Sequence, residues 1–319
     1  MKMIKNFLKE TVEVVSRLGC KSISEDDLPD DLCAKLQKLR TNGYVTFDHL
    51  VGSNLFAKSK KYVNHQIENE LAFQTPCLAQ SHIEHERDLD LIKRNFKASE
   101  SELAARNLLF ERNQVSSYEQ VIKDFAPSTL TLNLPQQSDI FDLWLDADVT
   151  AVIEAYMGFT PILREAYVRR NFPCKYPVMN HKWHRDSNHR KHLLKAFIFF
   201  TDCDVDTGAH QYIAGSVNDD QFRQERYFED SEIDEAYPDV SGRRIISEVK
   251  AGTIMLEDTR GLHKAGIPKH SFRDLGYAVF LPGSIMHRSK ALYDVKPEIL
   301  NGLSAMQRRY IPTRAVCRN

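Results

Sequence analysis

Two side chains that can bind a metal ion stand two residues apart in the segment NHKWHRDSNH, namely His184 and Asp186. On an extended chain, residues i and i+2 project to the same face, so the imidazole and the carboxylate can converge on one ion. One more nitrogen ligand would complete a facial triad, which leaves three adjacent coordination positions open and is typical of non-haem iron(II) oxygenases. The spacing therefore predicts part of a metal centre for oxidative chemistry.

His263 is the best candidate for the third ligand. It lies in the segment EDTRGLHKAG, just past the apolar, strand-like run at residues 252–256. Glycines on both sides of it would let the backbone bend so that the ring points inward. The sequence thus predicts that iron(II) is bound by His184, Asp186 and His263, and these three residues form the expected catalytic centre.

Arg273 begins a predicted strand soon after His263, and alternate residues of a strand face opposite sides. Arg273, Leu275, Tyr277 and Val279 would share the interior face, where a guanidinium is costly unless it is paired with an anion. A planar guanidinium can hold a carboxylate through two parallel hydrogen bonds. The distal carboxylate of 2-oxoglutarate fits this requirement, so we expect Arg273 to bind that co-substrate.

Three further residues could approach the co-substrate: Lys195, Tyr167 and Asn171. Each lies in a run of apolar, β-branched or aromatic residues that is typical of a strand. Ordinary packing within a strand explains each of them at least as well. They remain candidates for co-substrate binding beside Arg273.

Basic side chains crowd the segment around the first two ligands. Such a patch could receive an acidic substrate, for example a sugar acid, a phosphate or a CoA ester, although a solvated surface explains it at least as well. Candidate substrate contacts are Trp183, as a wall of the pocket, Lys182 and Arg169. Three nearby histidines are not expected to be ligands, because none combines a carboxylate at i+2 with placement in a strand. They are His181, His189 and His192.

The elements that must position these residues change in character near Pro161. Beyond it, short apolar runs separated by Gly, Pro, Asn and Asp predict strands without intervening helices, which implies an antiparallel sandwich or barrel. The predicted strands are residues 167–172, 193–201, 211–214, 244–249, 253–256 and 276–281. Before Pro161, the predicted elements are helices at 1–19, 32–39 and 138–158, a strand at 44–47, and helical structure up to about residue 125.

Composition limits the classes of function. Lys plus Arg number 43 and Asp plus Glu 44, for a formal charge of -1, so no global field draws the chain to nucleic acid or an anionic membrane. The six cysteines form no CxxC pair and are expected to be reduced, and the opening segment lacks the apolar stretch of a secretory signal. No run approaches the roughly 18 apolar residues of a membrane span. We expect a cytoplasmic protein with a small-molecule substrate, without nucleic-acid partners or stable membrane insertion, and the oligomeric state stays open.

The run WHRD, followed by LLKAFIFFTDCDVDTGAHQYIAGS and GTIMLEDTRGLHKAGIPKHSFRDLGYAVF, resembles the phytanoyl-CoA dioxygenase family of iron(II)- and 2-oxoglutarate-dependent oxygenases. The resemblance extends over roughly residues 44–281 and is most specific after Tyr167. It implies a cupin-like jelly roll, or double-stranded β-helix, with ferrous iron and 2-oxoglutarate bound by the residues inferred above. The chain departs from the family pattern at Val217 and Ala265, which leaves the ligands intact.

The resemblance also implies a reaction: hydroxylation of an unactivated C–H bond of a small metabolite with O2, releasing succinate and CO2. An anionic metabolite is one option. Related halogenases leave the carboxylate position empty for chloride, so Asp186 favours hydroxylation, or a desaturation, over halogenation. The alternative is a non-catalytic or non-oxidative metal-binding protein on the same jelly-roll scaffold. We expect a single, mainly β domain over residues 1–319, with an α buttress mainly at 1–160 and the jelly-roll core at about 161–290.

Overall fold

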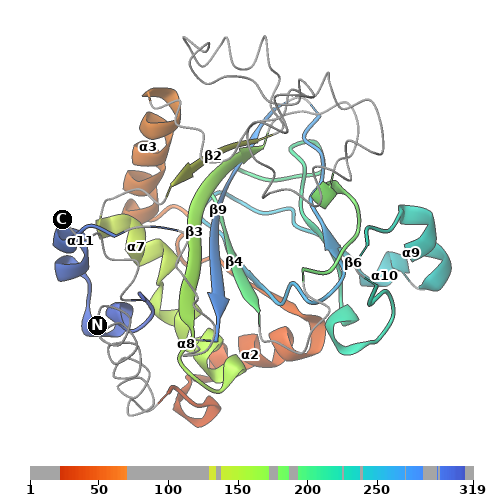
Figure 1. The fold of residues 1–319 in the computed structure, drawn as a ribbon, viewed down its shortest axis with the longest axis horizontal. Coiled ribbons are helices and arrows are strands. Elements are labelled where there is room, and N and C mark those ends of the chain that lie inside the picture. The colour runs from red at the N-terminus through yellow and green to blue at the C-terminus, as the bar shows by residue number, and fades with distance from the viewer. Residues whose placement is uncertain are drawn as a thin grey trace, which may run out of the picture.

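The computed structural model describes residues 22–69, 129–133, 138–171, 179–186, 193–224, 226–237, 240–269, 271–282, 293 and 295–312. The helix expected at the N-terminus, and the helical stretch expected beyond residue 69, lie outside these residues. The described strands form two antiparallel sheets, and helices cover one side of the larger sheet (Figure 1).

The larger sheet has six strands. In their order across the sheet they are β1 (Tyr44–Phe47), β7 (Ile254–Glu257), β4 (Leu194–Phe199), β9 (Arg273–Leu281), β3 (Ile162–Asn171) and β2 (Thr129–Asn133). All neighbours are antiparallel. Because this order differs from the order in the chain, distant residues pair directly, as Lys195 does with Glu257.

The smaller sheet has three strands. They are β6 (Arg244–Ile246), β5 (Gln211–Ile213) and β8 (His263–Lys264), in that order. Beside β8, an isolated antiparallel bridge pairs His184 with His263 and so adds the first metal-binding segment to this sheet. The two antiparallel sheets with helical support confirm the predicted fold class, a jelly roll with an α buttress.

Side chains alternate across β4 between two apolar clusters. Ala196 and Ile198 pack with the helices, whereas Phe197 and Phe199 point to the other face. This second group, the inner cluster, consists of Phe197, Phe199, Cys203, Ala209, Met255, Leu275 and Tyr277. The larger sheet therefore has one face against helices and one face, which we call the inner face, toward the smaller sheet.

The helices lie mainly before and after the sheet-forming part of the chain. They are α2 (Asp30–Asn42), α3 (Asn54–Asn69), α7 (Ser138–Trp144), α8 (Ala147–Met157), α9 (Asp230–Ala236), α10 (Val240–Arg243), α11 (Pro297–Gly302) and α12 (Ala305–Arg308), with 3-10 turns at Glu25–Asp27, Met179–His181 and Ser216–Asn218. Within the described ranges, no helix is long and apolar enough to cross a membrane.

Two helix predictions meet different outcomes. The helix expected to stop near Gly43 does so, and Gly43 adopts a left-handed φ of 86° that few other residues tolerate. The single helix expected from Ser138 to Gly158 is wrong, because the chain forms α7 and α8 with a break between them. Asp146 starts α8 by accepting hydrogen bonds from the backbone of Asp148 and Val149.

The strand β2, which the sequence pattern did not indicate, pairs with β3.

Candidate metal and co-substrate site

The three residues expected to bind iron converge in the structure. His184 and His263 exchange two backbone hydrogen bonds of 3.0 and 3.1 Å, and their ring centroids lie 4.3 Å apart. The backbone N–H of Asp186 donates to the carbonyl of Thr259 at 3.0 Å, which extends the same pairing. One ligand atom from each of His184, Asp186 and His263 lies within 4.8 Å of the other two, a spacing that could hold one metal ion.

Both imidazoles are oriented by their own backbone. The Nδ1 of His184 lies 2.9 Å from the carbonyl of Lys182, and the Nδ1 of His263 lies 3.0 Å from the carbonyl of Gly261. With Nδ1 protonated and donating, each Nε2 keeps its lone pair for a metal. The two Nε2 atoms are 3.8 and 3.4 Å from the carboxylate oxygens of Asp186. All three side chains thus aim their donor atoms at one point.

The glycine before His263 is needed for space. A Cβ at Gly261 would collide with the phenol of Tyr212, whose hydroxyl donates to the carbonyl of Asp258 at 3.0 Å. The sequence argument expected this glycine to allow a bend, but Gly261 is not among the glycines with positive φ. The close approach of Tyr212 is therefore the physical reason for glycine at this position.

Electrostatics favour the protonation states that a metal needs at His184 and Asp186. At His263, burial alone would lower the pKa, but the Asp186 carboxylate raises it, so a metal must displace a proton there. Burial, with the nearby His263, lowers the pKa of His184 to about 3. Desolvation alone would raise the pKa of Asp186, but the ammonium of Lys195 and the two imidazoles hold it well below its usual range. A neutral imidazole and an ionised carboxylate are the forms that bind a divalent cation.

Lys195 lies against the carboxylate of Asp186. It projects from β4 toward the inner face, and its Nζ is 2.6 Å from Oδ2 of Asp186. Burial by itself would lower the pKa of Lys195, but the Asp186 carboxylate raises it, so the ammonium stays charged. The ion pair neutralises Asp186 inside the metal-free chain.

Arg273 occupies the interior position that the strand alternation predicted. It is 1% exposed, and its Nη1 donates to the carbonyl of Gly208. Its Nε is buried without a hydrogen-bond partner among the described residues. Burying a guanidinium with an N–H group that donates to no acceptor is costly, unless a bound anion accepts that hydrogen bond. This observation fits a carboxylate ligand.

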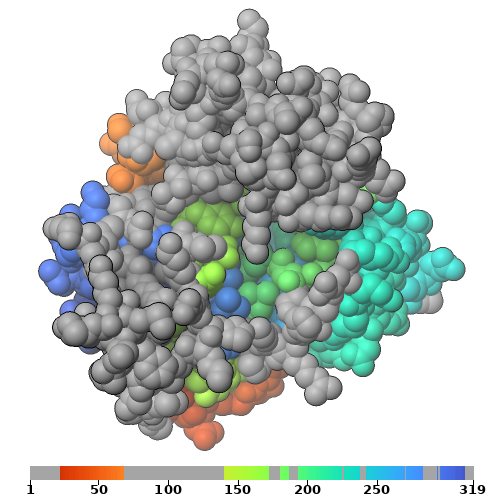
Figure 2. Space-filling view, in the orientation of Figure 1, coloured from red at the N-terminus to blue at the C-terminus, as the bar shows by residue number. Residues whose placement is uncertain are grey.

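The remaining candidates on β3 lie on the same inner face. Tyr167 stacks on Tyr277 with ring centroids 4.7 Å apart, and burial raises the pKa of its phenol to about 12. The guanidinium of Arg169 lies 5.2 Å from the Tyr167 ring centroid and 5.3 Å from that of Tyr277. Asn171 donates to the backbone carbonyl of Arg273 at 3.4 Å. Figure 2 shows residues of β3, in green, and of β9, in blue, at the bottom of a hollow in this face of the molecule.

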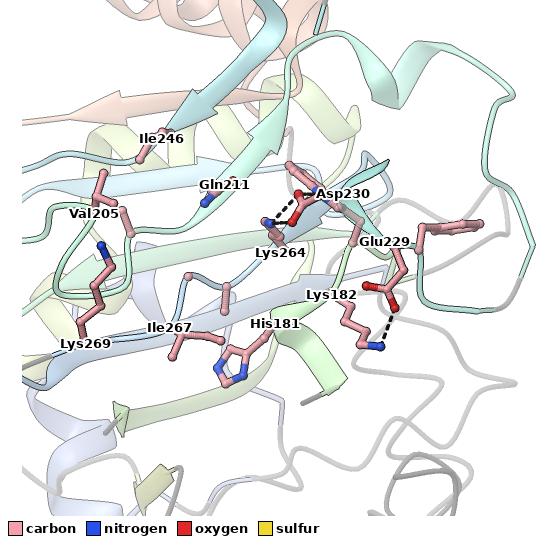
Figure 3. A pocket seen from close by; sticks show the side chains of 15 residues that line it. His181, Lys182, Val205, Gln211, Glu229, Asp230, Ile246, Lys264, Ile267 and Lys269 are labelled. Carbon is pink, nitrogen blue, oxygen red and sulfur yellow. Dashed lines mark hydrogen bonds and ion pairs between the residues drawn. The ribbon is translucent and has the colours of Figure 1, made fainter. Parts of the chain in front are cut away.

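Trp183 and Lys182 lie away from the metal ligands. Trp183 is 1% exposed, packs with Ile213 and Leu262, and donates from Nε1 to Asp230 at 2.7 Å. Its neighbour Lys182 pairs with Glu229 at 2.6 Å. Both line a separate cavity of about 290 Å³ on the outer face of the smaller sheet (Figure 3). Because adjacent residues of an extended segment face opposite ways, Trp183 cannot share the side on which His184 lies.

His181 also lines the outer cavity and is not part of the metal-binding set. It is 8% exposed, and burial, together with the nearby Arg273 and Lys264, lowers its pKa to about 4. His189 and His192 lie outside the described residues. That His181 does not bind the metal stays a prediction.

Two site residues escaped the sequence analysis, His210 and Glu257. Both are buried beside His263: His210 Nε2 lies 2.9 Å from a Glu257 carboxylate oxygen, and the His210 ring centroid lies 5.5 Å from that of His263. Burial raises the pKa of Glu257 to about 8 and lowers that of His210 well below its usual range. A lone acid ending an otherwise apolar strand, IMLE, was the signal that could have identified Glu257.

Replacing Glu257 with glutamine is expected to flatten the pH dependence of stability in the metal-free chain. Folded, Glu257 keeps its proton up to about pH 8, whereas the ordinary pKa is 4.5. The folded state therefore binds more protons, and the free energy of unfolding falls as the pH rises through this window. Urea unfolding in EDTA between pH 6.5 and 8 should show a decline that is steeper in the unsubstituted chain, by about 2 kcal/mol at most. His210 and His263, whose pKa values also shift on folding, are present in both chains, so the difference between the two curves reports Glu257. Parallel declines in the two chains would contradict the assignment.

Comparison with protein families gives one match. A family model described as phytanoyl-CoA dioxygenase matches residues 98–269, which is more than half of the chain. The matched residues include His184, Asp186 and His263. The comparison with curated proteins gives no match.

Comparison with solved structures gives matches of low identity. The non-heme alpha ketoglutarate dependent epimerase SnoN from nogalamycin biosynthesis has a TM-score of 0.51 at 14% identity, covering 80% of this chain and 84% of that chain. SnoN in complex with Fe3+, alpha ketoglutarate and nogalamycin RO has a TM-score of 0.52 at 14% identity, covering 80% and 85%. EctD from S. alaskensis with bound Fe has a TM-score of 0.48 at 14% identity, covering 82% and 81%. At such identity, the SnoN matches show a shared fold.

Proposed function

Since the chain belongs to the phytanoyl-CoA dioxygenase family, we propose that it hydroxylates an unactivated C–H bond of a small, anionic metabolite, with release of succinate and CO2. The family uses iron(II) as its cofactor and 2-oxoglutarate and dioxygen as co-substrates, and this chain carries out an oxidation that depends on them. The observation that carries the proposal is the convergence of two imidazoles and one carboxylate at one point, in a chain that also buries an arginine on the inner face of the larger sheet.

The proposed iron ligands are His184, Asp186 and His263. Their donor atoms fit a divalent ion, because the two rings present Nε2 and Asp186 is ionised. When bound, the iron, with 2-oxoglutarate and dioxygen, supplies the oxidising power for C–H cleavage. Three protein ligands leave neighbouring coordination positions for the co-substrate and dioxygen. Asp186 supplies a carboxylate, which favours hydroxylation over halogenation.

The proposed ligand of Arg273 is the distal carboxylate of 2-oxoglutarate. Support comes from the unpartnered, buried Nε of Arg273 and from its place on the same inner face as Lys195 and Tyr167. A guanidinium fixed by the Gly208 carbonyl is already oriented before the ligand arrives. Asn171 acts by holding the backbone of Arg273 in this proposal.

The proposed substrate carries an anionic group. Two cations besides Arg273, namely Arg169 and Lys195, project toward the inner face. The stacked rings of Tyr167 and Tyr277 lie under the Arg169 guanidinium and hold it in place, while their apolar surfaces can contact the carbon skeleton. A carboxylate or phosphate of the substrate would bind Arg169, with the C–H bond directed toward the metal.

One spectroscopic titration tests the proposed function. The purified chain is mixed anaerobically with iron(II), then with 2-oxoglutarate, while the visible spectrum is recorded. We expect a weak metal-to-ligand charge-transfer band that requires both additions. Once air is admitted, we expect succinate release that a panel of acidic metabolites stimulates. Iron binding without any effect of 2-oxoglutarate would support the non-oxidative alternative. Failure to bind iron would support a non-catalytic protein.

A further inference from the structure

The middle residue of the segment His184-Arg185-Asp186 points away from the metal ligands into the protein. The Arg185 side chain is 1% exposed. All five of its N–H groups can be assigned to acceptors: the carbonyls of Phe222 (3.2 Å), Ser216 (2.8 Å), Arg260 (2.5 Å) and Gln221 (2.8 Å), and a carboxylate oxygen of Asp219 (3.0 Å). A guanidinium has five such donors in a rigid fork, so none is left over.

These acceptors belong to two segments that flank the metal centre. One is the loop at residues 216–222, and the other is the turn containing Arg260, three positions before His263. The loop also contacts the residue before His263, because the Ser216 hydroxyl accepts from the backbone N–H of Leu262 at 2.8 Å. Arg185 therefore connects the segment that carries two ligands with the segments that place the third.

The loop is held in a costly conformation at the point where Arg185 binds. Phe222 has a φ of 56°, a left-handed value that non-glycine residues rarely adopt. Its carbonyl accepts from Nε of Arg185, and its ring packs edge to face on Phe228 at 4.7 Å. Such strain persists only where the surroundings determine the conformation. Asp219, the charged acceptor, is fixed in turn by the hydroxyl of Tyr237 at 2.9 Å.

We propose that Arg185 is the positioning residue of the metal centre, which sets the distance and orientation of His184 and Asp186 relative to His263 through its five hydrogen bonds. The proposal rests on the proposed iron site. Arg185 touches neither metal nor substrate, and it acts only through the segments that it joins. Removing a partner that orients ligands typically weakens metal binding about 10- to 100-fold.

The test uses Arg185→Lys in the full chain. Lysine keeps the positive charge, but its single ammonium cannot reach acceptors in a fork arrangement. Anaerobic calorimetric titration with cobalt(II) or iron(II) should give a dissociation constant about 10- to 100-fold higher than that of the unsubstituted chain. The visible ligand-field spectrum of bound cobalt(II), which reports coordination geometry, should change as well.

A matched control separates positioning from general stability. Arg170 is an equally buried arginine whose fork binds Asp274 at 2.7 and 2.6 Å, on the opposite face of the larger sheet from Arg273. Arg170→Lys should lower the unfolding temperature but leave metal affinity and the cobalt(II) spectrum unchanged. If both variants lose affinity equally, or if Arg185→Lys binds as the unsubstituted chain does, the positioning role is wrong.

If Arg185→Lys does not fold, a second variant still tests the proposal. Asp219→Asn removes the charged acceptor but keeps its shape, and it should raise the metal dissociation constant several-fold; an unchanged value would overturn the proposal. Failure of the proposed iron site gives a different result, since the unsubstituted chain itself would then bind neither cobalt(II) nor iron(II). If only the oxygenase function fails, the unsubstituted chain still binds the metal but shows no charge-transfer band with 2-oxoglutarate.

Discussion

Replacing His263 with alanine is expected to lower the affinity for iron(II) on the order of 10²- to 10³-fold and to abolish the charge-transfer band. The metal would lose one of three protein ligands, and each ligand of a folded site contributes several kcal/mol of binding free energy. His263 is also the ligand that comes from a separate part of the chain, so its loss leaves only His184 and Asp186 on one short segment. Anaerobic titration monitored by calorimetry and absorbance measures both effects.

His181→Ala is the matched control for this substitution. His181 is a buried histidine only three residues before His184, but it lines the outer cavity and is not in the metal-binding set. Its substitution should leave the iron affinity within a few-fold of the unsubstituted value. Equal losses for His181→Ala and His263→Ala would mean that the ligand assignment is wrong.

Replacing Arg273 with alanine is expected to raise the dissociation constant of 2-oxoglutarate about 10²- to 10³-fold, with iron affinity nearly unchanged. The substitution removes the buried cation and leaves a dianion without its partner, a loss of about 3 to 4 kcal/mol. Titration of the charge-transfer band with 2-oxoglutarate in the iron-loaded chain gives the constant. Arg273→Lys keeps the positive charge but loses the forked guanidinium. Its dissociation constant for 2-oxoglutarate should lie between that of Arg273→Ala and that of the unsubstituted chain.

Arg169→Met provides the complementary measurement. In the proposed arrangement Arg169 binds the substrate anion, so this variant should keep its affinity for 2-oxoglutarate and show a higher KM for an active acidic metabolite. The opposite pattern, with 2-oxoglutarate binding lost in Arg169→Met and retained in Arg273→Ala, would mean that Arg169 binds 2-oxoglutarate and Arg273 does not.

The approach of His184 to Asp186 and the inner position of Arg273 could be predicted from the sequence because both depend on local geometry. Residues i and i+2 of an extended segment face the same way, which brought His184 and Asp186 together, and the same alternation put Arg273 on the inner face. The rule also excludes Trp183 from the metal side, since it is the immediate neighbour of His184. The prediction of Trp183 as a wall of the substrate pocket rests only on the type of its side chain, which lines the outer cavity.

The contacts that were not foreseen depend on the order of strands in the sheets. Lys195 was expected near the co-substrate, but its ion pair with Asp186 follows from the pairing of β4 with β7 and β9 and from the position of the smaller sheet. His210 and Glu257 meet for the same reason. The break between α7 and α8 was missed because apolar residues recur on both sides of Asp146, and only its capping side chain marks the interruption.

The backbone bridge between His184 and His263 also has a consequence for folding. A slip of this pairing by one residue would turn the His263 imidazole to the opposite side and bring Leu262 or Lys264 to the place opposite His184. Neither of those side chains can serve as a ligand in that place. Iron would therefore bind only molecules whose strands have paired in the observed register. Metal binding would then select correctly folded molecules.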